Sequence, residues 1–250
     1  MHPGINSNNS IFGLTSNEIH LWQIPLDAQI DEVETYFNIL SSDERERAQK
    51  FHFKKDRNCF VITRGVLRIL SAKYVSKKPM EISFGLEEYG KPKLEHRTSL
   101  NFNVSHSGNM ALIGFVHNHA VGLDVEYIKR DIDVLDIAQN FFSKNEIEAL
   151  NAIELNKQYE AFYRCWTRKE AFIKAEGSGL SFPLDRFSVS MEKDDEASLY
   201  WVDWNSYEKE KWDIFSFKPN EDYIAAVTVK AKGYSLRKFE WDKDGVGTEL

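Results

Sequence analysis

Two acidic residues stand two positions apart in an apolar segment near the middle of the chain. The segment reads VGLDVEYI, and its acids are Asp124 and Glu126. In a β-strand, side chains two residues apart leave the same face, so both carboxylates would lie opposite Leu123 and Val125. Such a pair suits a shared hard cation. A D-x-E spacing alone is more often two unrelated acids on a solvated strand, so both interpretations stay open at this point.

A third acidic residue interrupts an apolar stripe on a predicted helix that spans residues 157–176. The stripe follows helical spacing and consists of Tyr159, Tyr163, Trp166 and Ile173. Glu170 occupies the position where the next apolar residue is missing. An unpaired charge on a buried face is costly, so we expect Glu170 to be metal-bound, ion-paired or held with a raised pKa. Lys174 shares that side, and the alternative is a simple Glu170–Lys174 pair at the edge of the core.

A short segment at residues 101–108 carries hydroxyl and imidazole groups. It reads NFNVSHSG, and a short strand is expected to end in Ser105, His106, Ser107 and Gly108. Hydroxyls, an imidazole and a flexible backbone favour a phosphate-binding turn. The alternative is a structural turn. A hydrolase triad is disfavoured, because no G-x-S-x-G motif accompanies the Ser-His pair.

Basic residues gather in one predicted helical region of an otherwise acidic protein. They are Arg45, Arg47, Lys50, Lys54, Lys55 and Arg57, and Lys91 and Lys93 follow later in the chain. Several cations that converge on one cleft would hold a polyanionic ligand. The alternative is a charge-rich helix surface, which Glu44 and Glu46 partly neutralise.

The elements that must position these residues alternate between strands and helices. Residues 18–24 alternate in polarity as a strand does, and residues 41–74 have helical spacing with an interruption at 53–56. Further strands are predicted at 82–84, 102–104, 111–116 and 120–125, helices at 132–153 and 157–176, and several strands within 187–239. This order predicts an α+β fold with two halves of similar size.

The predicted elements divide the chain into four segments. We expect a flexible leader at residues 1–17, an N-terminal α+β half at 18–118, a C-terminal α+β half at 119–240 that carries the metal site, and a flexible tail at 241–250. No clear sequence repeat relates the two halves.

Composition limits the functional classes. The 250 residues carry a formal net charge of −7, and 42% of them are hydrophobic, which is ample for a packed core. The acidic balance argues against a nucleic-acid partner. The chain has no apolar run long enough for a membrane span and its first residues lack the pattern of a signal peptide, so we expect a soluble cytoplasmic protein with no membrane partner. Cys59 and Cys165 indicate neither a disulfide framework nor a zinc site.

Four motifs, taken in order, resemble the surfactin-synthetase-activating (Sfp) type of 4'-phosphopantetheinyl transferase. That family shows a G-K-P turn, an F-N-x-S-H-S-G segment, a G-[IL]-D-x-E strand and a W-[ST]-x-K-E-[AS]-x-x-K helix. Here the four motifs occupy residues 90–92, 102–108, 122–126 and 166–174. The resemblance implies the 4'-phosphopantetheinyl transferase fold, with two similar α+β halves arranged as a pseudo-dimer in a monomer.

The resemblance also implies a role for each matching residue. Asp124, Glu126 and Glu170 would hold a magnesium ion, with Glu126 ranking below the other two as a ligand. Lys174 would contact the pyrophosphate of coenzyme A, Ser105 and His106 its phosphates, Lys91 and Pro92 the nucleotide side, and Arg47 the 3'-phosphate. The predicted catalytic residues are Glu170, Lys174 and His106, with Glu170 as the general base.

The activity implied is transfer of the 4'-phosphopantetheine arm of coenzyme A to a serine of an apo acyl or peptidyl carrier protein. The products would be the holo carrier and adenosine 3',5'-bisphosphate, as in holo-[acyl-carrier-protein] synthase activity. Phe141, Phe142 and Lys144 are candidates for the surface that receives the carrier. The alternatives are a non-catalytic coenzyme A-binding protein of the same fold and a magnesium-dependent phosphohydrolase. The sequence does not distinguish a carrier of fatty-acid, polyketide, nonribosomal-peptide or lysine-pathway machinery.

Overall fold

The computed structural model describes residues 12–27, 30–179, 182–242 and 247–250 of the chain. Its first half consists of β1 (Glu18–Pro25), α1 (Ile30–Asn38), α2 (Ser42–Gln49), α3 (Lys54–Tyr74), β2 (Phe84–Leu86), β3 (Pro92–Leu94), β4 (Leu100–Ser107) and β5 (Met110–His117). Its second half consists of β6 (Val121–Tyr127), α4 (Val134–Phe141), α5 (Lys144–Ala152), α6 (Leu155–Glu176), β7 (Phe187–Val189), β8 (Leu199–Val202), β9 (Asp213–Phe217) and β10 (Tyr223–Val229). Strands β11 (Ser235–Trp241) and β12 (Gly247–Glu249) follow.

Both halves pass through the same order of elements: a strand, three helices, a short hairpin and two more strands. In the first half β1 pairs antiparallel with β5, which pairs antiparallel with β4. In the second half β6 pairs in the same way with β10, and β10 with β9. This topology confirms the predicted α+β fold with two similar halves, although the halves show no clear sequence repeat.

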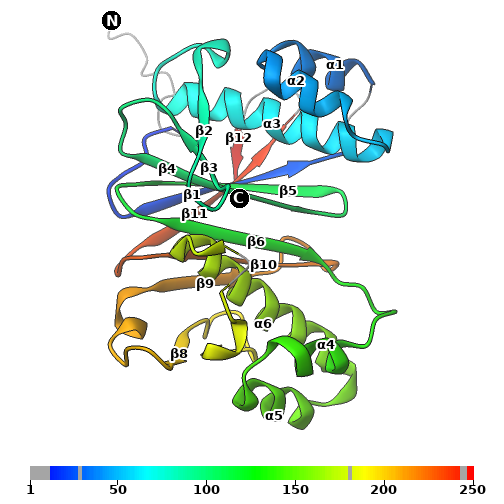
Figure 1. The fold of residues 1–250 in the computed structure, drawn as a ribbon, viewed down its shortest axis with the longest axis vertical. Helices are drawn as coiled ribbons and strands as arrows, with labels where there is room; N and C mark the ends of the chain where they lie inside the picture. The colour runs from blue at the N-terminus through cyan, green and yellow to red at the C-terminus, as the bar shows by residue number, and fades with distance from the viewer. Residues whose placement is uncertain (1–11, 28–29, 180–181, 243–246) are drawn as a thin grey trace, which may run out of the picture.

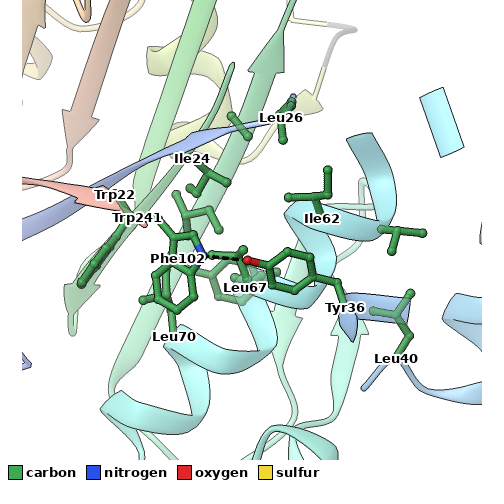
Figure 2. Packing of buried hydrophobic residues seen from close by; sticks show 14 of the residues in the cluster. Trp22, Ile24, Leu26, Tyr36, Leu40, Ile62, Leu67, Leu70, Phe102 and Trp241 are labelled. Carbon is green, nitrogen blue, oxygen red and sulfur yellow. Dashed lines mark hydrogen bonds between the residues drawn. The ribbon is translucent and has the colours of Figure 1, made fainter. Parts of the chain in front are cut away.

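The two sheets lie against each other in the middle of the molecule, and each is covered by helices on its outer face (Figure 1). Three apolar cores result. One lies between the first sheet and α1 to α3, one joins α4 to α6 with β7 and β8, and one fills the space between the sheets. The first core also ties in the end of the chain, because the indole Nε1 of Trp241 donates a hydrogen bond to the Tyr36 hydroxyl at 3.0 Å (Figure 2).

Glycine lets the second sheet and its helix approach closely. A Cβ at Gly122 of β6 would lie 2.1 Å from the carbonyl oxygen of Ala171 and 2.3 Å from the amide nitrogen of Ala175, both in α6. Any larger residue would push the helix off the strand. Because β6 carries Asp124 and α6 carries Glu170, this contact sets the distance between the two acidic elements.

The structure differs from the sequence prediction in several elements. Helix α1 was not predicted, and the helix expected at residues 132–153 is two helices, α4 and α5. The second begins at a capping box in which Ser143 accepts from the Glu146 amide and Glu146 accepts from the Ser143 amide. This S-x-x-E signature was readable in the sequence. Helix α2 begins at Ser42, and Ser41 is its N-cap.

The ends of the chain also differ from the predicted segments. Strand β11 pairs in parallel with β1, so residues assigned to the C-terminal half extend the sheet of the first half. Strand β12 then pairs with β11 within the predicted tail. Of the predicted leader, residues 1–11 lie outside the described residues, while Phe12 stacks on Trp22. The boundary at residues 118 and 119 stays a prediction. Within the described residues, no helix combines the length and the apolar character needed to cross a membrane.

A histidine is buried in the first sheet, with its Nε2 3.7 Å from Glu18 Oε2. The His20 side chain of β1 is fully buried, and its Nδ1 lies 2.8 Å from the Tyr74 hydroxyl. The indole Nε1 of Trp22 donates to the same hydroxyl at 3.0 Å. Burial, together with the charge of Arg237, lowers the pKa of His20 to about 4.

We therefore expect acid to destabilise the protein through His20. Its folded pKa lies below the unfolded value of 6.5, so the unfolded state binds more protons and stability falls as the pH drops from about 6.5 to about 4. The loss is on the order of 3 kcal/mol. Denaturant unfolding at a series of pH values should show this loss as a fall in the stability of the wild type relative to His20→Gln between about pH 6.5 and pH 4, because the other titrating groups are common to both proteins. The matched control His52→Gln, at an exposed position, should keep the wild-type slope. Parallel curves for the wild type and His20→Gln would contradict the prediction.

Candidate active site

A row of hydrogen bonds joins β4 of the first sheet to β6 of the second. The hydroxyl of Ser105 donates to Asp124 Oδ1 at 2.9 Å, and the hydroxyl of Ser107 donates to Glu126 Oε2 at 2.8 Å. The amide oxygen of Asn103 accepts from the Leu123 backbone at 3.0 Å. The alternation of a strand places these three β4 side chains on one face.

Most of the predicted phosphate-binding turn belongs to strand β4. Strand β4 continues through Ser107, so Ser105 and His106 lie within the strand and the turn begins at Gly108. The hydroxyls of Ser105 and Ser107 are directed at carboxylates. His106, by contrast, is exposed. His106 is thus the group of this segment that is available to a ligand.

Most of the predicted site residues line one cavity of about 430 Å³, which we call the acidic cavity. Its walls are Val104, Ser105, His106, Asp124, Glu126, Trp166, Glu170 and Lys174. Strand β6 contributes the first two carboxylates and α6 contributes Glu170 and Lys174, so the site lies where the close contact at Gly122 holds strand and helix together. Of the nine residues singled out from the sequence, the cavity therefore gathers six.

Asp124 is the most enclosed acid of this cavity. Its side chain is buried, and Lys174 Nζ lies 2.6 Å from Oδ1. The other oxygen, Oδ2, is buried and has no hydrogen-bond partner among the described residues. Burial raises the pKa of Asp124, while Lys174 and Ser105 oppose the shift. One carboxylate oxygen is therefore left without the donor or cation that a buried carboxylate normally has.

Glu170 behaves as its position in the apolar stripe predicted. The side chain is only 8% exposed, and burial together with the charges of Asp124 and Glu126 raises its pKa to about 7. Within the described part of the chain it forms no ion pair, because Lys174 turns to Asp124. The simple Glu170–Lys174 pair considered as an alternative is thus not formed. A carboxyl group with a pKa near neutrality can accept a proton and release it again.

Glu126 is the least buried of the three acids. Burial and the nearby charge of Asp124 raise its pKa, and the Ser107 hydroxyl opposes the shift. Three carboxylates facing one cavity thus repel each other, which disfavours their simultaneous ionisation without a cation. Among the residues that the structure describes, no group of three acids, histidines or cysteines is already arranged around a metal position.

A second cavity, of about 620 Å³, adjoins the first and is bordered by basic side chains. We call it the basic cavity. Val104 and His106 line both cavities, and Arg47 and Pro92 line this one. Lys55 and Arg64 add further positive charge, opposed by Asp56. The two cavities together form a path from a cationic to an acidic region, with His106 between them.

Arg64 was not singled out from the sequence. Its guanidinium lies 5.0 Å from the Phe84 ring and 5.9 Å from the Phe60 ring, and Arg47 stacks on Phe60 at 5.0 Å. Arg64 Nη1 is buried and has no hydrogen-bond partner among the described residues. Arg64 lies in a largely buried part of α3 with Arg68 one turn later, and the local sequence does not indicate which of these two arginines faces this cavity.

The nearby Glu44 offsets only part of this positive charge. Glu44 is buried and accepts a hydrogen bond from Arg68 Nε at 2.6 Å, while Arg64 Nε lies 3.7 Å from its other oxygen. It also accepts from the Ser41 amide at the start of α2. Glu44 is thus a structural partner of Arg68, and Arg47 and Arg64 remain as cations beside one aromatic ring.

Lys91 is the one predicted residue that lines neither of these two cavities. Its Nζ donates to the carbonyl oxygens of Val121 and Lys174, each at 2.9 Å. Burial lowers the pKa of Lys91, and Glu87 opposes the shift. The amine is thus directed away from the basic cavity, although the next residue, Pro92, lines that cavity.

Comparison with known proteins identifies this arrangement. Residues 25–116 match the family model of the 4'-phosphopantetheinyl transferase N-terminal region, and residues 120–228 match that of the 4'-phosphopantetheinyl transferase superfamily. The 4'-phosphopantetheinyl transferase HetI of Nostoc sp. is 34% identical over 224 residues, which cover 88% of this chain and 91% of that protein. The chain belongs to the 4'-phosphopantetheinyl transferase family. This transferase is also 35% identical to Sfp of Bacillus subtilis over 176 residues, covering 70% of this chain and 77% of Sfp. The predicted resemblance to the Sfp type is confirmed.

The two phenylalanines considered for carrier binding differ in exposure in this transferase. Phe142 is buried and stacks on Phe162 in the core of the second half. Phe141 is 45% exposed, and its ring meets the edge of Trp166, which lines the acidic cavity. Phe142 is thus a core residue, and only Phe141, with the exposed Lys144, is available to a partner beside the cavity.

Proposed function

We propose that this transferase moves the 4'-phosphopantetheine arm of coenzyme A onto a serine hydroxyl of an apo carrier protein, within the two adjoining cavities. One observation carries the proposal: three carboxylates and a lysine face one cavity that opens, past His106, into a second cavity bordered by arginines. Coenzyme A has phosphate groups at both ends of its nucleotide part, so it needs cations over an extended path. The two cavities supply such cations, with Arg47 and Arg64 in the basic cavity and Lys174 in the acidic cavity.

The basic cavity would receive the nucleotide. Phe60 and Phe51 supply apolar walls, and Arg47 and Arg64 supply charge for the 3'-phosphate. His106, on the border between the cavities, would meet the pyrophosphate, and Lys174 would meet it from the acidic side. Lys174 is part exposed, so its amine can turn from Asp124 to a phosphate oxygen without a new burial cost.

The donors in the acidic cavity fit a magnesium ion. Carboxylate oxygens are the ligands that this ion prefers, and Asp124 Oδ2 is a buried oxygen that has no hydrogen-bond partner among the residues that the structure describes. Asp124 and Glu170 would hold the ion, with Glu126 as a third, weaker contributor. Magnesium, when bound, would neutralise charge on the pyrophosphate oxygens as a Lewis acid.

The side chains of the chain itself would handle the proton. As the serine oxygen of the carrier forms a bond to the β-phosphorus, the bond from that phosphorus to the bridging oxygen breaks and adenosine 3',5'-bisphosphate leaves. Glu170 would accept the serine proton, directly or through a water molecule, because a desolvated carboxylate beside the serine can act as a base. Lys174 would stabilise the negative charge that develops on the bridging oxygen, which leaves with adenosine 3',5'-bisphosphate.

Mass spectrometry of a carrier panel tests the proposal. The purified chain is incubated with magnesium, coenzyme A and apo carriers of the fatty-acid, polyketide and nonribosomal-peptide types. At least one carrier should gain the mass of the phosphopantetheine arm, and its Ser→Ala variant should not. Binding of coenzyme A without transfer to any carrier would instead favour the non-catalytic alternative, and cleavage of coenzyme A without a carrier would favour the hydrolase. The monomeric state and the cytoplasmic location stay predictions.

Arg64→Met should weaken the use of coenzyme A without slowing the chemical step. A charge-assisted hydrogen bond to a phosphate contributes roughly 1.5 to 3 kcal/mol, so KM for coenzyme A should rise about 10-fold or more while kcat stays within about 3-fold. Glu44 keeps its bond to Arg68, so the variant should fold. Steady-state kinetics with varied coenzyme A measure both constants. Lys50→Met, an exposed charge at the end of the neighbouring helix α2 that lines neither cavity, is the matched control. An unchanged KM in Arg64→Met would remove the residue from the binding site.

A further inference from the structure

Two elements of the second half carry the proposed chemistry, and a residue of the first half is bonded to both. Lys91 stands just before β3, in the hairpin that β2 and β3 form in the first half (Figure 1). Its Nζ donates to the carbonyl oxygen of Val121, the first residue of β6, and to that of Lys174 in α6. Both bonds measure 2.9 Å. One ammonium group thus spans the strand of Asp124 and the helix of Glu170.

Lys91 donates to α6 at the C-terminal end of the helix, where backbone carbonyl groups need a partner from outside the helix. Helix α6 ends at Glu176, so the Lys174 carbonyl belongs to its last turn, where carbonyl groups have no partner within the helix. A cation at this end also interacts favourably with the helix dipole. Lys91 therefore acts as a C-terminal cap that comes from a distant part of the chain, and it holds the backbone of the residue whose Nζ contacts Asp124.

The surrounding contacts show that little movement is allowed at this point. Gly122 brings β6 so close to α6 that a Cβ would lie 2.1 Å from the Ala171 carbonyl oxygen. A Cβ at Gly179, just after the helix, would lie 3.2 Å from the Cβ of Tyr89 in the same hairpin as Lys91. The hairpin thus packs on the end of α6 through Tyr89 as well as through Lys91.

We infer that Lys91 is a positioning residue of the proposed transfer reaction, which holds the end of α6 against β6 so that Lys174 reaches the acidic cavity. The inference rests on the proposed function. It differs from the nucleotide contact that the family resemblance implies, because both described bonds of the amine go to backbone carbonyls. Since Pro92 of the same hairpin lines the basic cavity, Lys91 also fastens the wall of that cavity to the helix.

Kinetics of Lys91→Met and of the matched control Lys93→Met test this role. Lys93 lies two residues further along the same hairpin and is exposed. A shift of about 1 Å in a catalytic group costs on the order of 100-fold in rate, so kcat of Lys91→Met should fall about 10- to 100-fold. KM for coenzyme A should change less than about 3-fold, since a positioning residue does not touch the ligand. Lys93→Met should match the wild type. If Lys91→Met does not fold, Lys91→Gln, which keeps one donor, replaces it.

A double-mutant comparison separates positioning from general destabilisation. In a Lys174→Met background, Lys91→Met should lower the remaining rate by less than about 3-fold, because the group that it positions is already absent. Full additivity of the two effects on kcat would overturn the inference. So would a raised KM with unchanged kcat, which would make Lys91 a ligand contact.

Hydrogen exchange gives a readout that does not depend on transfer. Amides in the last turn of α6 should exchange faster in Lys91→Met than in Lys93→Met, while those in the middle of α6 should not change. Equal exchange in the two variants would overturn the inference. If the wild type modifies no carrier, the proposed function fails, and the exchange result still decides whether Lys91 holds the helix end.

Discussion

Asp124→Asn is expected to lower the rate of carrier modification by roughly 10³-fold or more. Asparagine keeps the volume and can still accept from Ser105, but it removes the negative charge that the proposed magnesium ion and Lys174 require. Metal stabilisation of the transition state is worth several kcal/mol, and each 1.36 kcal/mol is a factor of about ten in rate. The measurement is single-turnover transfer at saturating coenzyme A and magnesium, followed by mass spectrometry.

The fold should survive this change. Asp124 is buried, but its partner Lys174 is part exposed, so the lysine can be solvated after the charge is removed. Magnesium should raise the melting temperature of the wild type and not that of Asp124→Asn, which tests the metal site without any assay of activity. Glu126→Gln is the matched control, with a smaller loss of about 10-fold expected, because Glu126 is more exposed and is held by Ser107. Transfer by Asp124→Asn within about 10-fold of the wild type would contradict the assignment.

Glu170→Gln is expected to stabilise the metal-free protein while nearly abolishing transfer. Burial and the charges of Asp124 and Glu126 raise the pKa of Glu170 from 4.5 to about 7. A raised pKa means that the folded state binds more protons than the unfolded state, so this group lowers stability as the pH rises through 4.5 to about 7. Above pH 7 the full cost, on the order of 3 kcal/mol, is present in the wild type and absent in the glutamine variant.

The loss of activity follows from the same carboxylate. Glutamine cannot accept the serine proton, and removal of a general base costs about 10²- to 10⁴-fold in rate. Transfer rates are measured beside thermal melts in a chelator at pH 8. A higher melting temperature together with a transfer rate lowered by at least 100-fold would fit a residue retained for function at the expense of stability. Near wild-type transfer by a folded Glu170→Gln protein would remove its proposed role as the base. A lower melting temperature would make it a structural acid.

Several residues of the candidate site could be predicted from local periodicity in the sequence. The two-residue period of a strand requires Asp124 and Glu126 to share a face, and both line the acidic cavity. The helical period places Glu170 among apolar positions, and it is buried there. These features depend only on backbone geometry within one element, so they can be predicted from a few neighbouring residues. The motifs of one family, in order along the chain, then identify the chemistry.

Partners that come from distant elements had no such local signal. Lys174 was expected to share the side of Glu170, but only the packing of α6 on β6 directs its amine to Asp124. Asp124 itself is covered because β4 of the other sheet lies beside it. The family resemblance implied that Lys91 contacts the ligand, whereas in the structure its amine donates to the Lys174 carbonyl oxygen at the end of α6.

The pairing partners of the last strands also could not be predicted from the local sequence. Their apolar alternation predicts strands, but strand pairing depends on hydrogen bonds with a partner that can lie anywhere in the chain. Strand β11 therefore returns to β1, more than two hundred residues earlier in the sequence, and joins the sheet of the first half. The sequence by itself determined which residues have the chemistry and which face of each element they occupy. The tertiary structure alone decided which charges meet, because that depends on contacts between elements that are distant along the chain.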